Sequence, residues 1–356
     1  MKKRILAVLM ATVMVASMAA CGAAKKEEPA PAPAAEEPAA EEPATEEPAE
    51  EAPAEEAPAE EAAAGDKLVV GFAQIGQESG WRDAETASIQ GYAEENADTV
   101  ELKFADAQQK QENQIKAIKT FIEQGVDVIG LAPVVETGWD QVFAEAQEAG
   151  IPIVLVDRTA DVSEDLYSTF IGSDFVEEGK MAADEMAALI GEEGTVVELE
   201  GTVGASAATD RKTGFDDQIA AAYPNITIAA SQTGDFTRAQ GKEVMESFLK
   251  AHDDIKGVYA HNDDMALGAI EAIKEAGLKP GEDIKVVSID GVKAIFEAMA
   301  AGEANVTVEC NPLLGPLFFE TAAKLKAGEE VEKWVKQVDE VYRSETAAED
   351  LPTRQY

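Results

Sequence analysis

Short apolar runs alternate with longer segments of helical spacing from residue 67 onward, and this alternation restricts the possible folds more than any other feature of the sequence. Runs rich in β-branched residues predict strands, and apolar residues at every third or fourth position predict helices. Strands are predicted at 68–72, 100–104, 126–131, 151–156, 169–172, 195–199, 226–230, 256–260, 285–289 and 305–308. Helices are predicted at 81–96, 108–124, 139–149, 176–190, 208–222, 237–251, 264–276 and 292–301.

Continuous apolar strands separated by helices are typical of parallel sheets that carry helices on both faces. The region 67–356 has about 290 residues, which is more than one hydrophobic core usually holds. We therefore predict an α/β fold with two doubly wound, Rossmann-like parallel-sheet lobes.

The N-terminus has the pattern of an export signal. Lys2, Lys3 and Arg4 form a basic region, and the apolar run at 5–20 is shorter than the ~18–20 residues that span a bilayer. Small residues directly precede Cys21, as in bacterial lipoprotein signals. We expect residues 1–21 to form such a signal and Cys21 to carry a lipid. The alternative is an ordinary secretory signal in which Cys21 has no role.

The segment 22–66 consists almost entirely of Glu, Pro and Ala. It has too little apolar surface to offset the entropy of ordering, so we expect a disordered linker. Regular prolines and like charges favour an extended chain, which at ~3.1 Å per residue reaches up to ~140 Å. Because it follows a cysteine that we expect to be lipidated, we interpret this linker as a tether between a membrane and the folded region. An acidic interaction tail is the alternative.

Charge and residue counts exclude several classes of partner. The chain has a net charge of −41, of which −31 falls on residues 67–356. A body this acidic argues against nucleic-acid binding. If Cys21 is lipidated, Cys310 stands alone and no intrachain disulfide forms. With only His252 and His261, no His-rich metal site is expected, and we predict neither a metal nor a cofactor.

Polar and aromatic residues follow almost every predicted strand. In doubly wound sheets, ligands bind beyond the carboxyl ends of the strands. The candidate site residues there are Glu78, Ser79, Gly80, Trp81, Arg82, Asp157, Arg158, Arg211, Phe236, Asn262 and Asp290. Planar carboxylate, amide and guanidinium groups can pair with adjacent sugar hydroxyls, and aromatic faces cover the C–H side of a sugar ring. Three acids and three arginines balance, which favours a neutral ligand such as a monosaccharide.

Each candidate also has a purely structural interpretation. Asp157 and Arg158 could form a structural ion pair, Trp81 and Phe236 could pack in a core, and Asp290 could belong to a simple turn.

The run Asn262-Asp263-Asp264 could cap the following helix. We prefer the capping role for Asp263 and Asp264, and ligand contact for Asn262, because Asn262 comes first after its strand.

Several long segments of the body resemble one protein family: 78–82, 104–114, 132–139, 201–206, 234–238 and 260–265. They are similar to the periplasmic sugar-binding proteins of the ribose and galactose type, also called type I or cluster B. Within that family they resemble most the galactofuranose-binding proteins of bacterial ABC importers. The resemblance covers nearly all of 67–345.

The resemblance implies roles for the candidate residues. The 78–82 turn matches the first-lobe sugar contacts, and Asp157 with Arg158 matches a pair that binds ring hydroxyls. Arg211 matches the second-lobe arginine. The remaining matches are the asparagine, the aspartate and the stacking aromatic of the family, at Asn262, Asp290 and Phe236. Ribose-binding relatives have a glutamine where this chain has Cys310, followed by Asn311, which argues against ribose.

The resemblance also implies the domain organisation and the mechanism. The chain would cross between lobes near 172, 310 and 335, with 67–172 and 311–335 in the N-terminal lobe and 173–310 and 336–356 in the C-terminal lobe. Hinge closure would trap galactofuranose or a related monosaccharide for delivery to an ABC permease and its ATPase. We expect a monomeric extracytoplasmic lipoprotein, anchored to the cell membrane, that catalyses no reaction.

The sequence disfavours two other functions and leaves a third open. An enzyme is disfavoured because no Gly-x-Ser-x-Gly, Gly-x-x-x-x-Gly-Lys-Ser/Thr or His-Glu-x-x-His motif is present. A sugar-responsive repressor would need a helix-turn-helix and a basic face, where this chain has an export signal and an acidic linker. A receptor that passes a signal to a membrane sensor remains an open alternative.

Overall fold

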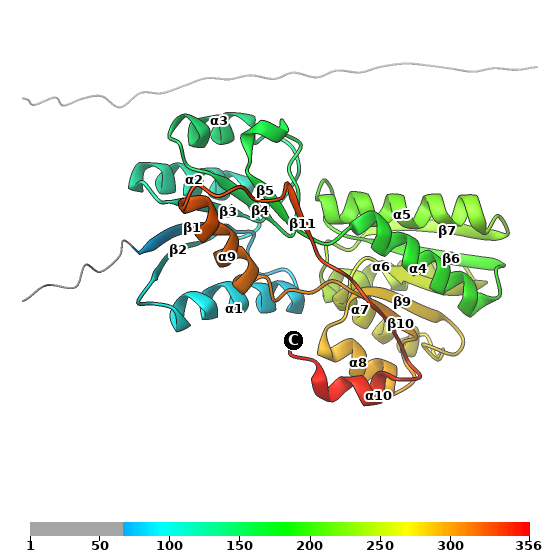
Figure 1. Ribbon diagram of the computed structural model, residues 1–356. Helices are drawn as coiled ribbons and strands as arrows, with labels where there is room; N and C mark the ends of the chain where they lie inside the picture. The colour runs from blue at the N-terminus through cyan, green and yellow to red at the C-terminus, as the bar shows by residue number, and fades with distance from the viewer. Residues whose placement is uncertain (1–66) are drawn as a thin grey trace, which may run out of the picture. The chain divides into compact units, whose positions relative to one another are not determined.

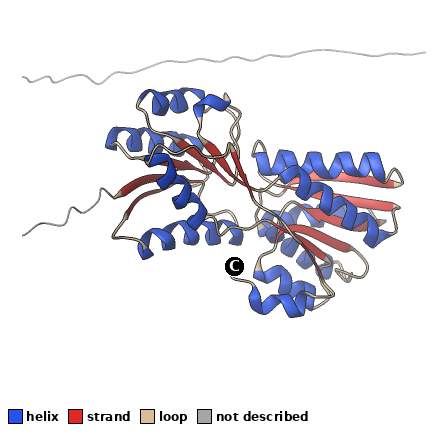
Figure 2. Ribbon diagram, viewed as in Figure 1, coloured by secondary structure: helices blue, strands red, loops and turns tan. Residues whose placement is uncertain are grey.

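The computed structural model describes residues 67–356; the predictions for the export signal, Cys21 and the linker lie outside these residues. The described chain forms two six-stranded sheets with helices on both faces of each (Figure 1, Figure 2). We call the region around the sheet that contains β1 the first lobe, and the region around the other sheet the second lobe. The predicted architecture of two parallel-sheet α/β lobes is therefore confirmed.

The first sheet has the strand order β11-β5-β4-β3-β1-β2, and all its strand pairs are parallel. Its strands are β1 (Leu68–Gln74), β2 (Val100–Asp106), β3 (Val128–Leu131), β4 (Ile153–Val156), β5 (Thr169–Gly172) and β11 (Trp334–Lys336). Its helices are α1 (Gly80–Glu95), α2 (Gln111–Gln124), α3 (Asp140–Glu148), the 3₁₀ turn η1 (Glu164–Leu166) and α9 (Gly315–Lys326).

The second sheet has the order β12-β10-β9-β8-β6-β7. Its strands are β6 (Gly194–Glu200), β7 (Ile226–Thr233), β8 (Ile255–Ala260), β9 (Lys285–Asp290), β10 (Val306–Glu309) and β12 (Val341–Arg343). Its helices are α4 (Phe175–Ile190), α5 (Ser206–Ala222), α6 (Arg238–Ala251), α7 (Asp263–Glu275), α8 (Lys293–Ala300), α10 (Ala347–Asp350) and the 3₁₀ turn η2 (Leu351–Thr353). The edge strand β12 is antiparallel to β10, so this sheet is not purely parallel as predicted.

Helix α2 and the strands β11 and β12 differ from the sequence-based expectation for local physical reasons. Helix α2 begins at Gln111 rather than at 108, because Gln108 and Gln109 have φ angles of 53° and 59°, which are incompatible with a right-handed helix. The short strands β11 and β12 were not predicted. Each has three residues and none of them is buried, so neither carries an apolar pattern in the sequence.

Apolar side chains fill both faces of the first sheet. Phe72 and Phe318 pack on one face with α1 and α9, and Phe121, Trp139 and Phe143 pack on the other with α2 and α3. The second lobe has one continuous apolar cluster around its sheet. The two lobes thus have separate cores, as expected for a chain of this length.

The chain passes between the lobes three times. It leaves the first sheet after Gly172, returns after Glu309, and leaves again between Lys336 and Val341. The boundary expected at 335 falls inside β11, because Lys336 still pairs with Gly172 in the first sheet. Every helix within residues 67–356 is too short or too polar to span a bilayer.

Candidate ligand-binding site

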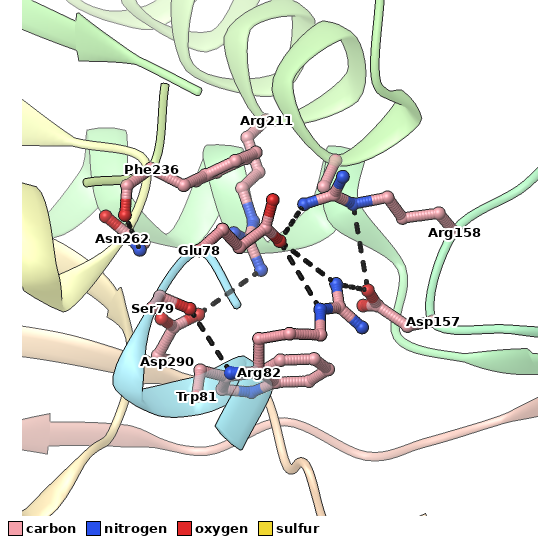
Figure 3. Close-up of a pocket in the computed structure, with 11 residues that line it drawn as sticks. Glu78, Ser79, Trp81, Arg82, Asp157, Arg158, Arg211, Phe236, Asn262 and Asp290 are labelled. Carbon is pink, nitrogen blue, oxygen red and sulfur yellow. Dashed lines mark hydrogen bonds and ion pairs between the residues drawn. The ribbon is translucent and has the colours of Figure 1, made fainter. Parts of the chain in front are cut away.

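The carboxyl ends of strands from both sheets face a small shared cavity (Figure 3). Its volume is about 20 Å³, which is room for about one water molecule. The residues that line it are Glu78, Ser79, Trp81, Arg82, Asp157, Arg158, Ala207, Arg211, Phe236, Asn262 and Asp290. Ten of the eleven residues predicted from the sequence are brought together here; Gly80 does not line the cavity, and Ala207 was not predicted.

On the first-lobe side, two arginines lie between carboxylates. Arg82 on α1 pairs with Glu78, with Asp157 after β4, and with Glu85 one turn further along α1. Arg158 Nη2 donates to the same Glu78 oxygen at 2.5 Å. Burial lowers the pKa of Arg82, but the three carboxylates outweigh it and raise this pKa above its usual value. Both guanidinium groups contact Glu78 beside the cavity, as Figure 3 shows.

Arg158 has donors that no described residue satisfies. Its side chain is 3% exposed, and its Nη1 atom has no hydrogen-bond acceptor within residues 67–356. Its Nε atom lies 3.8 Å from Asp157 Oδ2, an ion-pair distance that is too long for a hydrogen bond. Burial lowers the pKa of Arg158, and Glu78 opposes this. Leaving such donors buried without a hydrogen bond costs about 1–3 kcal/mol, and an oxygen atom that entered the cavity could accept from them.

On the second-lobe side, Arg211 of α5 is held at three points. Its Nε donates to Glu178 Oε2 at 2.7 Å, its Nη1 donates to the carbonyl of His261 at 2.8 Å, and its Nη2 lies 3.7 Å from Asp290 Oδ1. The ring of Phe175 lies 4.9 Å below the guanidinium. These contacts fix the plane of Arg211 before any ligand arrives.

Three cavity residues have backbone angles that L-residues rarely adopt. Asp157, Phe236 and Asp290 have φ angles of 64°, 59° and 129°. Such conformations cost of order 1–3 kcal/mol each and persist where the surroundings impose them, often at binding sites. Here they turn the three side chains toward one cavity.

The two aromatic candidates take part in both packing and the site. Trp81 Nε1 donates to the carbonyl of Cys310 at 2.5 Å, and its ring belongs to the apolar cluster of the second lobe. The Phe236 ring lies 5.0 Å from the Arg158 guanidinium of the opposite lobe. Each ring is nearly buried and also lines the cavity, so the structural interpretation does not exclude a ligand contact.

The three residues 262–264 do not divide the capping and ligand-contact roles as predicted. Asn262 caps α7, since its Oδ1 accepts from Met265 N at 3.0 Å, and it also lines the cavity. Asp263 is no cap: it accepts from the backbone amides of Gly291 and Val292 at 2.7 and 2.8 Å and so holds the loop after β9. Asp264 is no cap either.

The Asp264 carboxylate accepts from Gly80 N of the first lobe at 2.8 Å. The capping prediction was wrong for both aspartates because Asn262 already supplies the cap oxygen.

Sequence reasoning missed two buried glutamates behind the arginines. Glu85 contacts Arg82, Glu178 contacts Arg211, and both glutamates are 0% exposed. The available signal was a carboxylate at a helix position whose neighbours along the same face are apolar, because an acid there must be paired. Within the described residues, no cluster of three or more His, Cys, Asp or Glu side chains could hold a metal ion.

Comparison with known proteins places this architecture in one family. The model of the periplasmic binding protein domain matches residues 70–330. The galactofuranose-binding protein YtfQ of Escherichia coli (strain K12) is 53% identical over 290 residues, covering 80% of this chain and 90% of the relative.

Solved structures agree with this assignment. The arabinose ABC transporter binding protein of Shewanella sp. ANA-3, bound to L-arabinofuranose, is 50% identical, covers 81% of this chain and 95% of its own, and has a TM-score of 0.78. A Mycobacterium smegmatis protein in complex with β-D-fucofuranose is 53% identical with the same coverage and TM-score. The chain belongs to the periplasmic binding protein family, with the type I fold.

Proposed function

We propose that this protein is the substrate-binding subunit of a bacterial ABC sugar importer and that it binds galactofuranose or a related furanose in the cavity between the lobes. The named relatives at 50% identity or more bind galactofuranose, arabinofuranose and fucofuranose. Proteins of this family are solute-binding proteins and not enzymes, in agreement with the prediction that the chain catalyses no reaction.

The observation that carries the proposal is that the Nε and Nη1 donors of Arg158 have no hydrogen-bond acceptor within residues 67–356, in a cavity whose lining acids and arginines are equal in number. A sugar hydroxyl can accept from these donors without adding charge. Among the lining residues, the carboxylates of Glu78, Asp157 and Asp290 match three arginines in number. An anionic ligand would leave surplus negative charge in a buried site, which is costly.

Binding requires the lobes to open, because a cavity of about 20 Å³ holds no monosaccharide. In the open form, the first-lobe and second-lobe groups would face water separately. A sugar that contacts Arg158 and Arg211 together stabilises the closed form by its higher affinity for that form. The closed form then presents both lobes to the permease.

We also propose that Cys21 carries the lipid and that segment 22–66 tethers a monomeric binding domain to the membrane, outside the cytoplasm. The sequence pattern around Cys21 supports this. Metabolic labelling with a radioactive fatty acid should label the wild type. The Cys21→Ser variant should remain unlabelled and leave the membrane fraction, and retention of this variant in the membrane would contradict the anchor.

Isothermal titration calorimetry with a sugar panel tests the ligand assignment. Galactofuranose and arabinofuranose should bind, while ribose, galactopyranose and glucose should bind at least tenfold more weakly. Equal affinity for furanose and pyranose forms would contradict the furanose assignment, and no heat with any sugar would contradict the function itself. Recovery of unaltered sugar after incubation would support the absence of catalysis.

A further inference from the structure

A hydrogen bond joins the lobes at the edge of the site. The backbone N–H of Gly80, the first residue of α1, donates to Asp264 Oδ2 in the first turn of α7 at 2.8 Å. Neither residue lines the cavity. The bond therefore connects the first-lobe turn that carries Glu78 and Arg82 to the second lobe without involving the ligand space.

The surroundings of both partners favour this bond. The first amides of a helix have no intrahelical acceptor, and the positive end of the helix dipole attracts a carboxylate. The cap residue Ser79 accepts from Arg82 N, which leaves the Gly80 amide to be satisfied by another group. The other carboxylate oxygen, Asp264 Oδ1, lies 3.9 Å from Arg238 of its own lobe, which orients the carboxylate.

Other interlobe hydrogen bonds lie elsewhere along the cleft. Glu136 N donates to the carbonyl of Gly204 at 2.8 Å, and Thr159 N donates to Ser206 Oγ at 3.0 Å. Closure therefore rests on several contacts, and the loss of one should weaken it without abolishing it.

We propose that Asp264 and the Gly80 amide form a latch that exists only in the closed form and raises the affinity for the sugar without touching it. The inference rests on the proposed function, since the affinity concerned is that for the sugar. A contact that forms only on closing stabilises the closed form alone, and the sugar binds more tightly by the same factor. Asp264 is thus a positioning residue, because it also holds the turn that carries Glu78.

Asp264→Ala removes the acceptor and tests the latch directly. It should weaken sugar affinity about tenfold, the effect of losing one hydrogen bond to a charged group. The loss should appear as faster dissociation in stopped flow with little change in the association rate, because the latch forms after encounter. Glu271→Ala is the matched control: it removes an exposed carboxylate from the same helix, one that pairs with Lys242 within the second lobe.

The donor is tested with Gly80→Pro. Proline has no N–H and is accepted at the first position of a helix, and Ser79 already has the extended conformation that must precede proline. The proline ring would also displace the Asp264 carboxylate. The effect of Gly80→Pro on sugar affinity is therefore measured both in the wild-type protein and in the Asp264→Ala variant. It should reduce affinity at least tenfold in the wild type and have little further effect with Asp264→Ala, which is the signature of two groups acting on each other.

The fraction of molecules with closed lobes can be measured without any sugar. Dyes on cysteines introduced at the exposed positions Gln124 and Lys250 report the interlobe distance, in full-length protein with Cys21→Ser; the remaining Cys310 is buried. Without sugar, Asp264→Ala should show fewer closed molecules than wild type, at an unchanged melting temperature.

Two results would overturn the latch. The first is that Asp264→Ala binds sugar as tightly as Glu271→Ala and has the same fraction of closed molecules. The second is that the losses of affinity caused by Gly80→Pro and Asp264→Ala add up in the double variant. If the wild type binds no sugar, the proposed function fails, and the closed fraction without sugar still decides for or against the latch.

Discussion

The Arg211 guanidinium donates through Nε to Glu178 Oε2 at 2.7 Å, in a place where neither side chain is more than 4% exposed. Burial raises the pKa of Glu178 to about 8, although the Arg211 charge opposes this. The glutamate lies on α4 and the arginine on α5, two helices in close contact. The orientation of the second-lobe arginine is therefore set by a helix pair outside the cavity.

Replacing Glu178 should weaken sugar binding although Glu178 does not line the cavity. Glu178→Ala leaves Arg211 Nε without its acceptor, and affinity should fall about tenfold or more. Glu178→Gln keeps an acceptor oxygen of the same shape and should lose far less. Calorimetry measures both; equal affinities for the two variants would show that Glu178 does not position Arg211.

Arg211→Ala should cost ~2–4 kcal/mol of sugar affinity, because a buried charged donor is lost and Asp290 loses its counter-charge. Arg211→Lys keeps the charge but not the planar fork, and should recover only part of the affinity. Unchanged calorimetric affinity of Arg211→Ala would remove this residue from the site.

The stability of the second lobe should depend on the ionised form of Glu198. This buried carboxylate accepts from Lys212 at 2.5 Å and contacts His261 Nε2 at 2.9 Å. His261 Nδ1 accepts from Gly201 N, so Nε2 carries the proton and donates to Glu198. Burial raises the pKa of Glu198, but these hydrogen bonds and charges outweigh it and bring the pKa down from 4.5 to about 2.

Because the folded state lowers this pKa, the stabilisation is complete above pH 4.5 and is lost as the pH falls toward 2. It is on the order of 3 kcal/mol. Urea unfolding of wild type and Glu198→Gln should therefore differ most at neutral pH and converge near pH 2. Glu303→Gln, which removes the partly exposed partner of Lys274, serves as the control and should change stability by less than ~1 kcal/mol. A constant difference across this pH range would contradict the assignment.

Close helix packing should make Gly214→Ala destabilising. A Cβ at Gly214 would lie 2.1 Å from the Val176 carbonyl oxygen, so α4 and α5 would have to separate. We expect a loss of about 1–3 kcal/mol in thermal or urea unfolding. Gly91→Ala is the matched control, because nothing lies within 4 Å of its Cβ position and alanine favours a helix by roughly 0.5–1 kcal/mol. A Gly214→Ala protein as stable as the control would show that the helix contact is loose.

Much of the site could be predicted from which polar residues follow each predicted strand. Asp157, Arg158 and Asp290 stand at or just after the carboxyl ends of parallel strands, and in such sheets these ends lie on one edge. Glu85, Glu178 and the interlobe role of Asp264 were not predictable in this way. Glu85 lies within a helix and not at a strand end, and Glu178 and Asp264 act through partners distant in sequence, so the order of the strands does not point to them.

The sequence by itself determined the alternation of strands and helices, the division into two lobes and the polar character of the strand ends, because these depend on local apolar periodicity and on strand direction. Only the tertiary structure decided which carboxylate meets which arginine, that Gly80 bonds to Asp264, and that Asp263 holds a loop instead of capping a helix. Those outcomes depend on distances between segments far apart in the chain, and a hydrogen bond that is lost within a few tenths of an ångström leaves no periodic trace in the sequence.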